Sequence, residues 1–496
     1  MGLDPRTPVL VGVGQATRRH QVWPDLAGPL DLMAVAAEVA IADAGGFPPE
    51  RIDALSVVNV FSWNHGDAPG LLAGRLGVDA AQRNYLEVGG NTPQEEVNRL
   101  CVSLQKGEIR AALLAGGEAG AAKKAAKKAG HRAHWPTSET PLEPRAQREP
   151  VHPSEMRHLA ILPIRTYPMF ETALRAAAGR SIEDHRAHIG ALMAPFTEVA
   201  AANPYAWFPE ARSAADLMTV SAANRMVCWP YPKSVNSILD VDQGAALLLT
   251  TVGEARAAGV AEDLWVFPWA GSDCTDIWYV TERAAYDHSP AIRTNAANVF
   301  AIAGVDADAI AAFDLYSCFP SAVQLAMEAL GLEADDPRPF TVTGGLPYFG
   351  GPGNDYVTHS IASMVAHLRE RPGELGLVTG VGWFVTKNSM GLYSTQPPSQ
   401  PFGVNDRVAD EAAVAALDHP RLEAEPVVGD VATIEAYCVP YDRDGSPVTA
   451  IVIARLGPDR RAMLSTADTA VAAAMTEREW HGTKVEVGPN VTFVPL

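Results

Sequence analysis

Cysteine is scarce in this 496-residue chain, and its placement excludes two common uses of the residue. The five cysteines are an odd number, widely scattered, with no CxxC pair among them: Cys101, Cys228, Cys274, Cys318 and Cys438. This pattern argues against a disulfide framework and against a zinc site. The histidines are too dispersed to indicate another metal centre. We therefore expect no bound metal and a protein of the reducing cytoplasm.

Long apolar runs, a basic excess and nucleotide-binding loops are missing as well. No apolar run reaches the roughly 18 residues of a membrane-spanning helix, and the opening segment MGLDPRTPVLVGVGQ lacks the features of a signal peptide. The 39 basic and 58 acidic residues give a net charge of −19, which disfavours nucleic acid as a partner because duplex binding neutralises phosphates. Neither a Walker-type loop nor a strand-linked GxGxxG occurs, so nucleotide hydrolysis and dinucleotide binding are not expected.

Short apolar runs alternate with helical patterns over the first 120 residues. Runs typical of buried strands lie at 9–15, 54–60, 85–90 and 111–120, and a helix closed by glycine is predicted at 31–45. A second helix is predicted before the last run, with Thr92 as its N-cap, Pro93 at its first position and Glu95 completing a capping box. Buried strands separated by helices predict a mostly parallel sheet covered on both faces.

The alternation breaks after residue 120 and returns from 264–272 onward. Residues 121–240 are rich in Pro, Arg, His and Trp. A strand at 311–320, a helix, the glycine run GGLPYFGGP and the apolar strand LVTGVG then repeat the order of the first part. We interpret this as an internal duplication with an active cleft between the halves, where helix N-termini converge.

The character changes again after a proline-marked linker at 393–401. Two β-rich runs joined by an Asp-Gly turn predict a hairpin, and further strands follow. We expect a small barrel-like β domain. The predicted domains are an N-terminal half, an inserted loop domain, a return strand with the C-terminal half, and the β domain: 1–120, 121–240, 241–400 and 405–496.

Several segments resemble motifs of the thiolase superfamily. KGEIRAALLAGGEAG resembles the strand after the nucleophile helix, and NSILDVDQGAALLLTT the return into the core. DLYSCF resembles the His-Asp-Cys-Phe motif, GGLPYFGGP the Gly-His-Pro motif and LVTGVG the Cys-x-Gly strand. The resemblance covers about residues 6–400 and is closest to sterol-carrier-protein-type thiolases and actinobacterial type 1 thiolase-like proteins, which carry an extra C-terminal β domain.

This resemblance implies the fold and the kind of ligand. The fold is α/β, a duplicated βαβαβαββ core in α-β-α-β-α layers with an inserted loop domain and a C-terminal β domain, here expected to be OB-like. The implied ligand is CoA or an acyl-CoA, with no covalently bound cofactor.

The reactive positions of that family are altered in this chain. The nucleophilic cysteine, whose pKa a helix N-terminus lowers, corresponds to Gly89 or Gly90. The Gly-His-Pro histidine corresponds to Gly351, the Cys-x-Gly cysteine to Val378, and the His-Asp pair to Tyr316-Ser317. Without a nucleophile no acyl-enzyme forms, so ordinary thiolase catalysis is expected to be lost.

Cys318 is the one residue that keeps a reactive identity. In sterol-carrier-type thiolases the corresponding cysteine does acid/base work, so Cys318 is the candidate catalytic residue, and a buried remnant without a basic neighbour is the alternative. Cys101 lies roughly 16 Å along the nucleophile helix and is expected to be a packed core residue. His359, four residues after Asp355, is interpreted as a solvated helix histidine paired with that carboxylate rather than as a relocated base.

Glycines and lysines supply the candidate ligand contacts. The pocket for pantetheine or a thioester is expected at Gly90, Tyr316, Gly351, Gly380 and Gly382, where the last two present backbone N–H groups as an oxyanion hole does. The only dense basic run, KKAAKKAGHR, places four lysines on one helical face: Lys123, Lys124, Lys127 and Lys128. They are candidates for holding the CoA phosphates, and a solvated surface helix is the alternative.

Three functions remain open from the sequence. In the first, this is a protein of the acetyl-CoA acetyltransferase family that binds a CoA thioester, acts in lipid metabolism and has lost thiolase catalysis. In the second, it is an active acyltransferase or C–C lyase that acts on an unusual acyl-CoA through Cys318. In the third, it is a non-catalytic scaffold whose C-terminal domain binds a partner protein.

Overall fold

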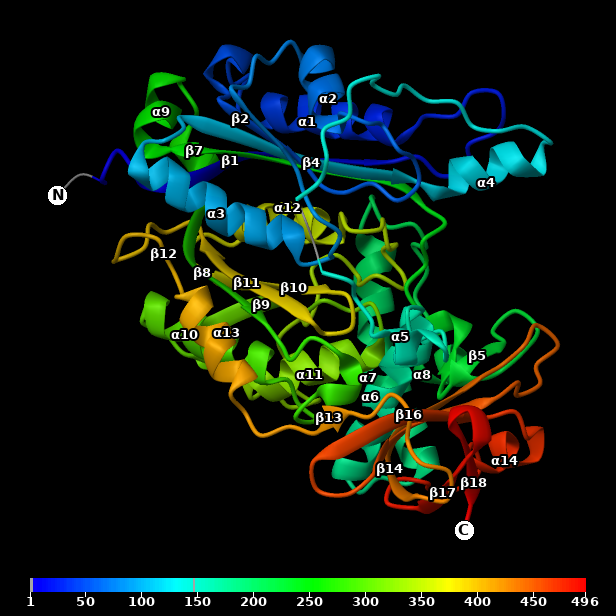
Figure 1. Ribbon diagram of the computed structural model, residues 1–496. Helices are drawn as coiled ribbons and strands as arrows, with labels where there is room; N and C mark the ends of the chain where they lie inside the picture. Colours follow the sequence, from blue (N-terminus) through cyan, green and yellow to red (C-terminus); the bar gives the residue numbers. More distant parts are fainter. Residues whose placement is uncertain (1–2, 146–147) are drawn as a thin grey trace.

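Two β-sheets with helices between and outside them form the body of the molecule (Figure 1). The computed structural model describes residues 3–145 and 148–496. Two helices lie side by side between the sheets, α3 (Thr92–Lys106) and α12 (Tyr356–Glu370). Further helices cover the outer face of each sheet. The predicted α-β-α-β-α layering is confirmed.

The first sheet has the strand order β1-β7-β4-β2-β3. β7 pairs antiparallel with β1 and β4, whereas β2 pairs parallel with β4 and β3. The outer face carries α1 and α2. The bounds are β1 (Pro8–Thr17), β2 (Ala54–Val57), β3 (Gln82–Tyr85), β4 (Ala111–Ala119), β7 (Asp242–Thr251), α1 (Pro29–Asp43) and α2 (Ala68–Leu76).

The second sheet repeats this arrangement with the order β12-β8-β11-β10-β9. β11 pairs antiparallel with β8 and β10, and β10 pairs parallel with β9, as in the first sheet. In the place of β3, Phe313 and Leu315 donate backbone hydrogen bonds to the carbonyls of Pro339 and Phe340. The internal duplication is therefore confirmed. The bounds are β8 (Phe267–Thr275), β9 (Ile310–Asp314), β10 (Leu375–Gly382), β11 (Lys387–Ser394), β12 (Gly403–Val404), α10 (Pro290–Ala303), α11 (Pro320–Leu330) and α13 (Arg407–Ala415).

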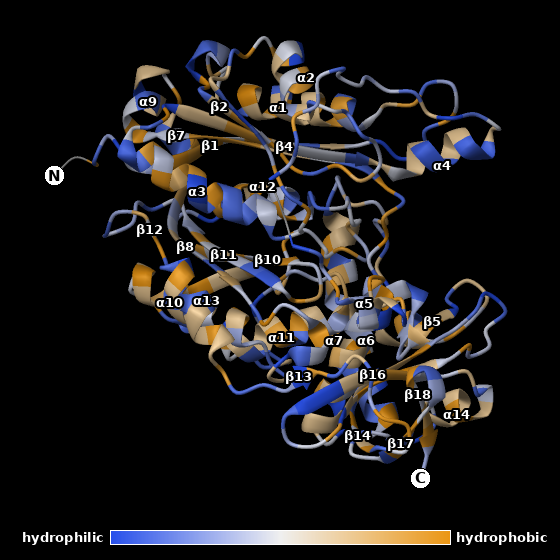
Figure 2. Ribbon diagram, viewed as in Figure 1, coloured by the Kyte–Doolittle hydropathy of each residue, from blue (hydrophilic) through white to orange (hydrophobic). Residues whose placement is uncertain are grey.

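Burial of whole strands explains why the core sequence reads as continuous apolar and small residues. Every residue of β4, β7 and β11 is buried, because a sheet between two helical layers has no solvated face. The apolar face predicted for α3 is buried, including Cys101. Figure 2 shows the hydrophobic colour along these strands and the mixed colour of the outer helices.

Two local predictions at the tip of α3 are wrong. The run YLEVGG is not a strand, since β3 is the preceding polar segment QRNY and the chain turns away at Gly89, whose positive φ of 157° favours glycine. The helix begins one residue earlier than predicted, with Asn91 as its N-cap and Thr92 as its first residue. The hydroxyl of Thr92 donates instead to the carbonyl of Gly89, 2.8 Å away, and tightens this turn.

The chain between β4 and β7 forms a mostly helical region beside the second sheet (Figure 1). Its helix α6 packs on α11. The elements are α4 (Gly120–Lys128), α5 (Pro153–Met156), α6 (Pro163–Ala177), α7 (Ile182–Ala202), α8 (Ala214–Met218), β5 (Met226–Trp229) and β6 (Tyr231–Pro232), and α9 (Val252–Ala257) follows β7. The predicted domain boundaries stay predictions.

A C-terminal β domain is present, as expected. The hairpin predicted around the Asp-Gly turn is formed by β14 and β15. The ring closes because β15 pairs with β16, β16 with β18, β18 with β17, and β17 with β14. The bounds are β13 (Arg421–Leu422), β14 (Val431–Pro440), β15 (Ala450–Arg455), β16 (Arg460–Thr466), β17 (Lys484–Gly488), β18 (Thr492–Pro495) and α14 (Thr469–Ala474).

The β domain is fixed to the rest of the chain by strand pairing and a buried cation. β14 pairs antiparallel with β5 of the helical region. Arg461 is almost fully buried, donates to the carbonyls of Thr281 and Arg283, and pairs with Glu435 at 2.6 Å. The two hydrogen bonds to the Thr281 and Arg283 carbonyls cross to the core, whereas Glu435 balances the charge of the buried guanidinium from within the β domain.

A membrane-spanning helix and a metal-binding cluster are both absent from the described residues. No helix in that part of the chain is long and apolar enough to cross a membrane. Residues 3–145 and 148–496 also contain no group of three or more His, Cys, Asp or Glu side chains arranged to hold a metal ion.

Candidate functional site

A cavity of about 500 Å³ opens at the tips of the two central helices. The turn before α3 contributes Gly89 and Gly90 to its wall, and the turn before α12 contributes Gly353 and Asn354. The connection from β9 to α11 and residues of the loop region complete the lining. The lining is mostly apolar, and Lys233 is its only charged residue among those described. A thioester or another apolar chain with few charges therefore fits its chemistry.

The structure brings three of the predicted site residues together in the cavity wall. Gly90, Tyr316 and Cys318 all line it. Gly351, Gly380 and Gly382 do not, since they lie behind residues that do, such as Ser237 and Val381. Gly380 and Gly382 belong to β10, where they face Ser389 and Lys387 of β11.

Tyr316 fills the space beside Gly90, one of the two positions predicted to correspond to the family's nucleophile. A β-carbon added to Gly90 would lie 2.7 Å from both the Tyr316 ring and the carbonyl oxygen of Val381, and closer still to the tyrosine hydroxyl. Tyr316 is held by a 2.8 Å hydrogen bond from its backbone N–H to Thr379 and by an edge-on contact with Tyr356. Its hydroxyl has no hydrogen-bond partner among the described residues.

The turn that carries Gly90 is tied down by two polar side chains that the sequence did not single out. The Oδ1 atom of Asn354 accepts from the Gly89 N–H at 2.9 Å, and its Nδ2 donates to the carbonyl of Asn59. The Nζ atom of Lys387 donates to the Val88 carbonyl at 2.7 Å. Both side chains are buried. In the sequence, Asn354 precedes Asp355 at the end of the glycine run and Lys387 stands among polar residues at the start of a strand, so neither position signals its role.

The second glycine position is filled in the same way. A β-carbon on Gly351 would overlap the Ser237 hydroxyl and lie 3.2 Å from the carbonyl of Ile238. At Gly380 the added atom would lie 2.9 Å from the Cα of Asn91. No described residue of the cavity lining is a histidine, aspartate or glutamate, so the wall offers no general base.

Cys318 lines the cavity, but its surroundings disfavour the reactive thiolate form. Burial raises the pKa of its thiol to about 12. The side chain that bonds to it is the Tyr167 hydroxyl, which also donates to the carbonyl of Trp383 at 2.9 Å. A thiolate forms readily beside a cation or a base, and the neutral tyrosine is neither.

His359 is not the solvated histidine that its helical position suggests. It is fully buried because the first ten residues of α12, 356–365, are all buried between the two sheets. Its Nδ1 lies 2.8 Å from Gln15, and its Nε2 is 3.7 Å from the Asp355 carboxylate. Burial lowers the pKa of His359 to about 3, so its imidazole is neutral near pH 7, and burial raises the pKa of Asp355. Neither residue lines the cavity.

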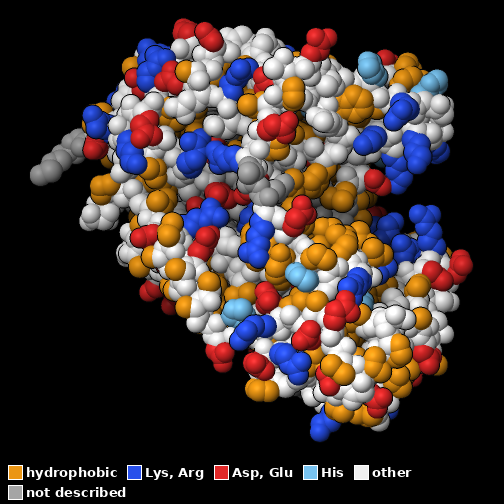
Figure 3. Space-filling model, viewed as in Figure 1, with side chains coloured by type: hydrophobic (Ala, Val, Ile, Leu, Met, Phe, Trp, Pro, Cys, Tyr) orange, Lys and Arg blue, Asp and Glu red, His pale blue; other side chains and the backbone are white. Residues whose placement is uncertain are grey.

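The four lysines of α4 stand beside the cavity mouth. The amino group of Lys123 donates to the carbonyl of Ser62 at 2.9 Å, and that of Lys124 pairs with Asp240 at 2.6 Å. Both contacts adjoin lining residues, Phe61 and Leu239. Lys127 and Lys128 follow in the last turn and are exposed. Figure 3 shows basic side chains on α4 and on the opposite side of the hollow beneath it.

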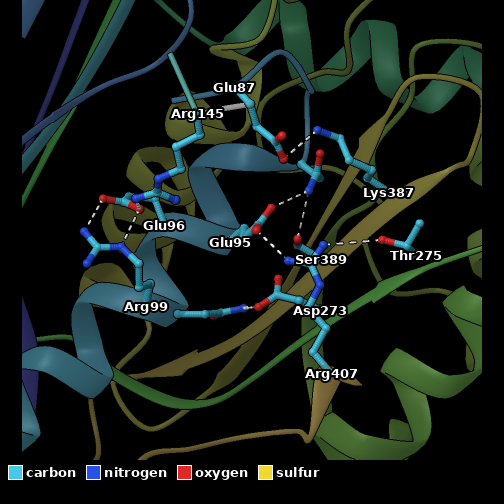
Figure 4. A network of polar contacts seen from close by, with 12 residues as sticks. Glu87, Glu95, Glu96, Arg99, Arg145, Asp273, Thr275, Lys387, Ser389 and Arg407 are labelled. Carbon is cyan, nitrogen blue, oxygen red and sulfur yellow. Dashed lines mark hydrogen bonds and ion pairs between the residues drawn. The ribbon is translucent and has the colours of Figure 1, made fainter. Parts of the chain in front are cut away.

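A polar network supports the α3 tip from behind (Figure 4). Arg407 of α13 pairs with Glu95 at 2.6 Å, and Asn91 donates to the same carboxylate. Asp273 lies next to this pair and accepts from Asn98 at 3.1 Å. Burial and the neighbouring Glu95 carboxylate raise the pKa of Asp273 to about 7.

Comparison with known proteins places this architecture. The chain superposes on the crystal structure of a monomeric SCP2-thiolase-like protein type 1 from Mycobacterium smegmatis with a TM-score of 0.85, at 33% identity and with 100% of both chains covered. Residues 411–492 match the family model of the thiolase-like protein type 1 additional C-terminal domain. A search of curated proteins found no match.

Two more distant structures share the fold alone. The Ltp2-ChsH2(DUF35) aldolase matches with a TM-score of 0.61 and 17% identity, over 79% of this chain and 99% of that one. Human mitochondrial 3-ketoacyl-CoA thiolase in complex with CoA matches with a TM-score of 0.56 and 15% identity, over 79% and 99%.

The duplicated five-layer core is thus the thiolase fold. With a fully covering relative at 33% identity and a matching C-terminal domain, the chain belongs to the SCP2-thiolase-like protein type 1 family of the thiolase superfamily.

Proposed function

We propose that this protein binds CoA or an acyl-CoA in the cavity and has lost thiolase catalysis. The observation that carries the proposal is the filled space beside Gly90, where the Tyr316 ring and the Val381 carbonyl leave no room for a nucleophilic side chain. Acyl transfer through a covalent intermediate requires that nucleophile and a base to activate it.

The lining and the mouth of the cavity support the binding of a thioester. The apolar walls suit an acyl chain or a pantetheine arm, and the turns at the helix tips bring backbone close to it. CoA carries a 3′-phosphate and a pyrophosphate, and the α4 lysines offer positive charge at the mouth. Lys233 adds a cation within the lining. The structure of a human thiolase holding CoA supports the same ligand class.

A second candidate is an acyltransferase or C–C lyase that uses Cys318, because this thiol does line the cavity. The raised pKa of the thiol and the absence of a general base from the described lining weigh against it. A scaffold role through the C-terminal β domain is the third candidate. The same proposal includes a role in lipid metabolism, a cytoplasmic location and a monomeric state. The description of the Mycobacterium smegmatis relative as monomeric supports the last of these.

Calorimetric titration with CoA and with octanoyl-CoA tests the proposal. The wild type should bind both, and a variant with Lys123, Lys124, Lys127 and Lys128 changed to alanine should bind CoA on the order of tenfold more weakly, since each charge-assisted phosphate contact contributes about 1 kcal/mol or more. Lys106→Ala, an exposed lysine at the end of α3, is the control. An unchanged dissociation constant would show that the lysines do not contact CoA. If neither ligand bound to the wild type, the proposal would be refuted.

A further inference from the structure

The cavity mouth is surrounded by exposed apolar side chains that a small ligand inside the cavity does not cover. We call them the mouth patch: Phe61, Met156, Leu159, Leu162 and Leu239, each 40–61% exposed. Phe61, Leu162 and Leu239 also line the cavity. Backbone hydrogen bonds from Leu159 to Met156 and from Leu162 to Leu159 fold the other two onto the same segment. Figure 3 shows hydrophobic side chains gathered beside the hollow under α4.

Positive charge adjoins this patch in an otherwise acidic protein. The net charge is −19, yet α4 places four lysines within nine residues. Lys123 and Lys124 are anchored next to Phe61 and Leu239, so the helix is fixed at the edge of the mouth patch. Lys127 and Lys128 make no ion pair with the described residues. An apolar centre with a charged rim is the usual anatomy of a protein–protein interface.

We propose that the mouth patch and α4 dock an acidic carrier protein that delivers its acyl thioester into the cavity on a phosphopantetheine arm. This inference rests on the proposed function, because the arm would occupy the same cavity as pantetheine of CoA. It adds a partner and a source for the thioester. The arm reaches inward past Phe61 and Leu239, while the carrier covers the apolar rim and faces the lysines with its acidic surface.

The shape and charge of the surface favour a carrier protein over the other occupants. The polar ADP portion of free CoA would meet the lysines but leave Met156 and Leu159 in water, since neither residue lines the cavity. An anionic membrane also matches basic and apolar groups, but it is flat, and the mouth lies in a hollow (Figure 3). A small convex domain with an extended arm fits the hollow.

Direct binding to the full-length protein tests this proposal. The probes are octanoyl-pantetheine, octanoyl-CoA, a bacterial acyl carrier protein in its octanoyl and apo forms, and vesicles of phosphatidylglycerol. The octanoyl carrier should bind at least about tenfold more tightly than octanoyl-pantetheine, a gain of about 1.4 kcal/mol from the protein surface. The apo form, which lacks the arm, should bind more weakly than the octanoyl form.

Two variants test the docking surface, and the first of them separates docking from occupation of the cavity. Met156→Ser/Leu159→Ser should weaken the octanoyl carrier by about tenfold and leave octanoyl-CoA unchanged, because these side chains lie outside the cavity. Lys127→Glu/Lys128→Glu should weaken the carrier and flatten the salt dependence of its binding. Leu417→Ser and Lys484→Glu, exposed positions outside the cavity lining, are the matched controls.

The outcomes distinguish this inference from the function on which it rests. If octanoyl-CoA binds but the octanoyl carrier binds no more tightly than octanoyl-pantetheine, the docking surface is refuted and the CoA proposal stands. Binding to phosphatidylglycerol vesicles that the Met156→Ser/Leu159→Ser variant abolishes would assign the surface to membranes and also refute the carrier. If no small thioester binds, both proposals fail.

Discussion

The two halves of the core have the same strand order and the same central helix, yet the tips of those helices are anchored differently. In the second half, buried Asp314 accepts hydrogen bonds from Thr341, Thr343, Tyr356 and Ser360. In the first half, the turn before α3 is held by Asn354 and Lys387, both of which come from the other half. The carboxylate that anchors the α12 tip therefore belongs to its own half, whereas the side chains that hold the α3 tip come from the other half.

The halves agree, however, in how two glycines are packed. Each glycine stands where the sequence predicts a reactive position of the family, and each faces a group that leaves no space for a side chain: Tyr316 at Gly90 and Ser237 at Gly351. Close packing explains the pairing, since an unfilled hole would cost stability. The comparison shows that both halves close the space at their predicted reactive position with a side chain that is distant in the sequence.

The largest effect is expected from removing the Asp314 carboxylate, which anchors the tip of α12. Asp314→Ala leaves several buried donors without an acceptor, so the free energy of unfolding should fall by at least about 3 kcal/mol. Urea denaturation measures this loss. Asp308→Ala, which changes an exposed aspartate in the same half, should have little effect. Equal losses in the two variants would contradict the anchoring role.

A matched pair of glycine substitutions compares the refilled spaces. Gly90→Ala should cost about 1–3 kcal/mol because the added methyl meets a packed ring and a backbone carbonyl. Gly351→Ala should cost less, because the Ser237 hydroxyl can rotate away. Gly74→Ala, in open space on α2, serves as the control.

Tyr316 must then be coupled to Gly90. In the Gly90→Ala/Tyr316→Ala double variant, the total loss of stability should be smaller than the sum of the single losses. Strict additivity would show that Tyr316 does not limit the space at this tip.

The network behind the first tip gives a pH dependence through Asp273. The folded-state pKa of Asp273 is raised to about 7, above the roughly 3.9 of an unfolded chain. The folded protein therefore holds a proton that the unfolded chain releases, and stability is lost as pH rises from about 4 to about 7.

Asp273→Asn removes this titration while keeping an acceptor for Asn98. The stability of the wild type relative to this variant should fall with rising pH, by up to about 1.4 kcal/mol per unit. Urea denaturation at several pH values within that window measures the difference. A difference that stays constant or rises with pH would contradict the assignment.

The smallest effect is expected at Cys318. Because burial raises its pKa to about 12 and no base lines the cavity among the described residues, Cys318→Ser should leave the dissociation constant of octanoyl-CoA unchanged. Alkylation of the native protein by iodoacetamide at pH 8 should likewise spare Cys318. If the wild type turns over an acyl-CoA and the serine variant does not, the lyase or acyltransferase alternative is correct.

Much of the fold was predictable because periodicity and glycine placement are local signals. Patterns within about twenty residues predict the buried strands, helix α3 and the C-terminal hairpin. The duplication follows from the repeated order of such patterns along the chain. The error at YLEVGG has a clear cause, since only Tyr85 belongs to a strand and Val88, Gly89 and Gly90 form a turn that lines the cavity. The error at His359 arises because helical periodicity cannot show that residues 356–365 of α12 are buried on all faces between the two sheets.

The site was predictable only as a set of missing residues. Motif alignment located Gly90, Gly351 and Cys318, but it could not show which distant side chain fills each space. Asn354, Lys387 and Lys233 act through contacts that depend on the packing of the two halves. The roles of these residues could therefore be recognised only in the folded structure.

Incubation of the protein with acetoacetyl-CoA and CoA, followed by intact-mass measurement and an assay of thioester loss, tests the central claim most directly. A protein whose nucleophile position is refilled should bind the thioester, keep its unmodified mass and consume no substrate. A covalent acyl adduct, or thiolysis above the rate without protein, would contradict the account.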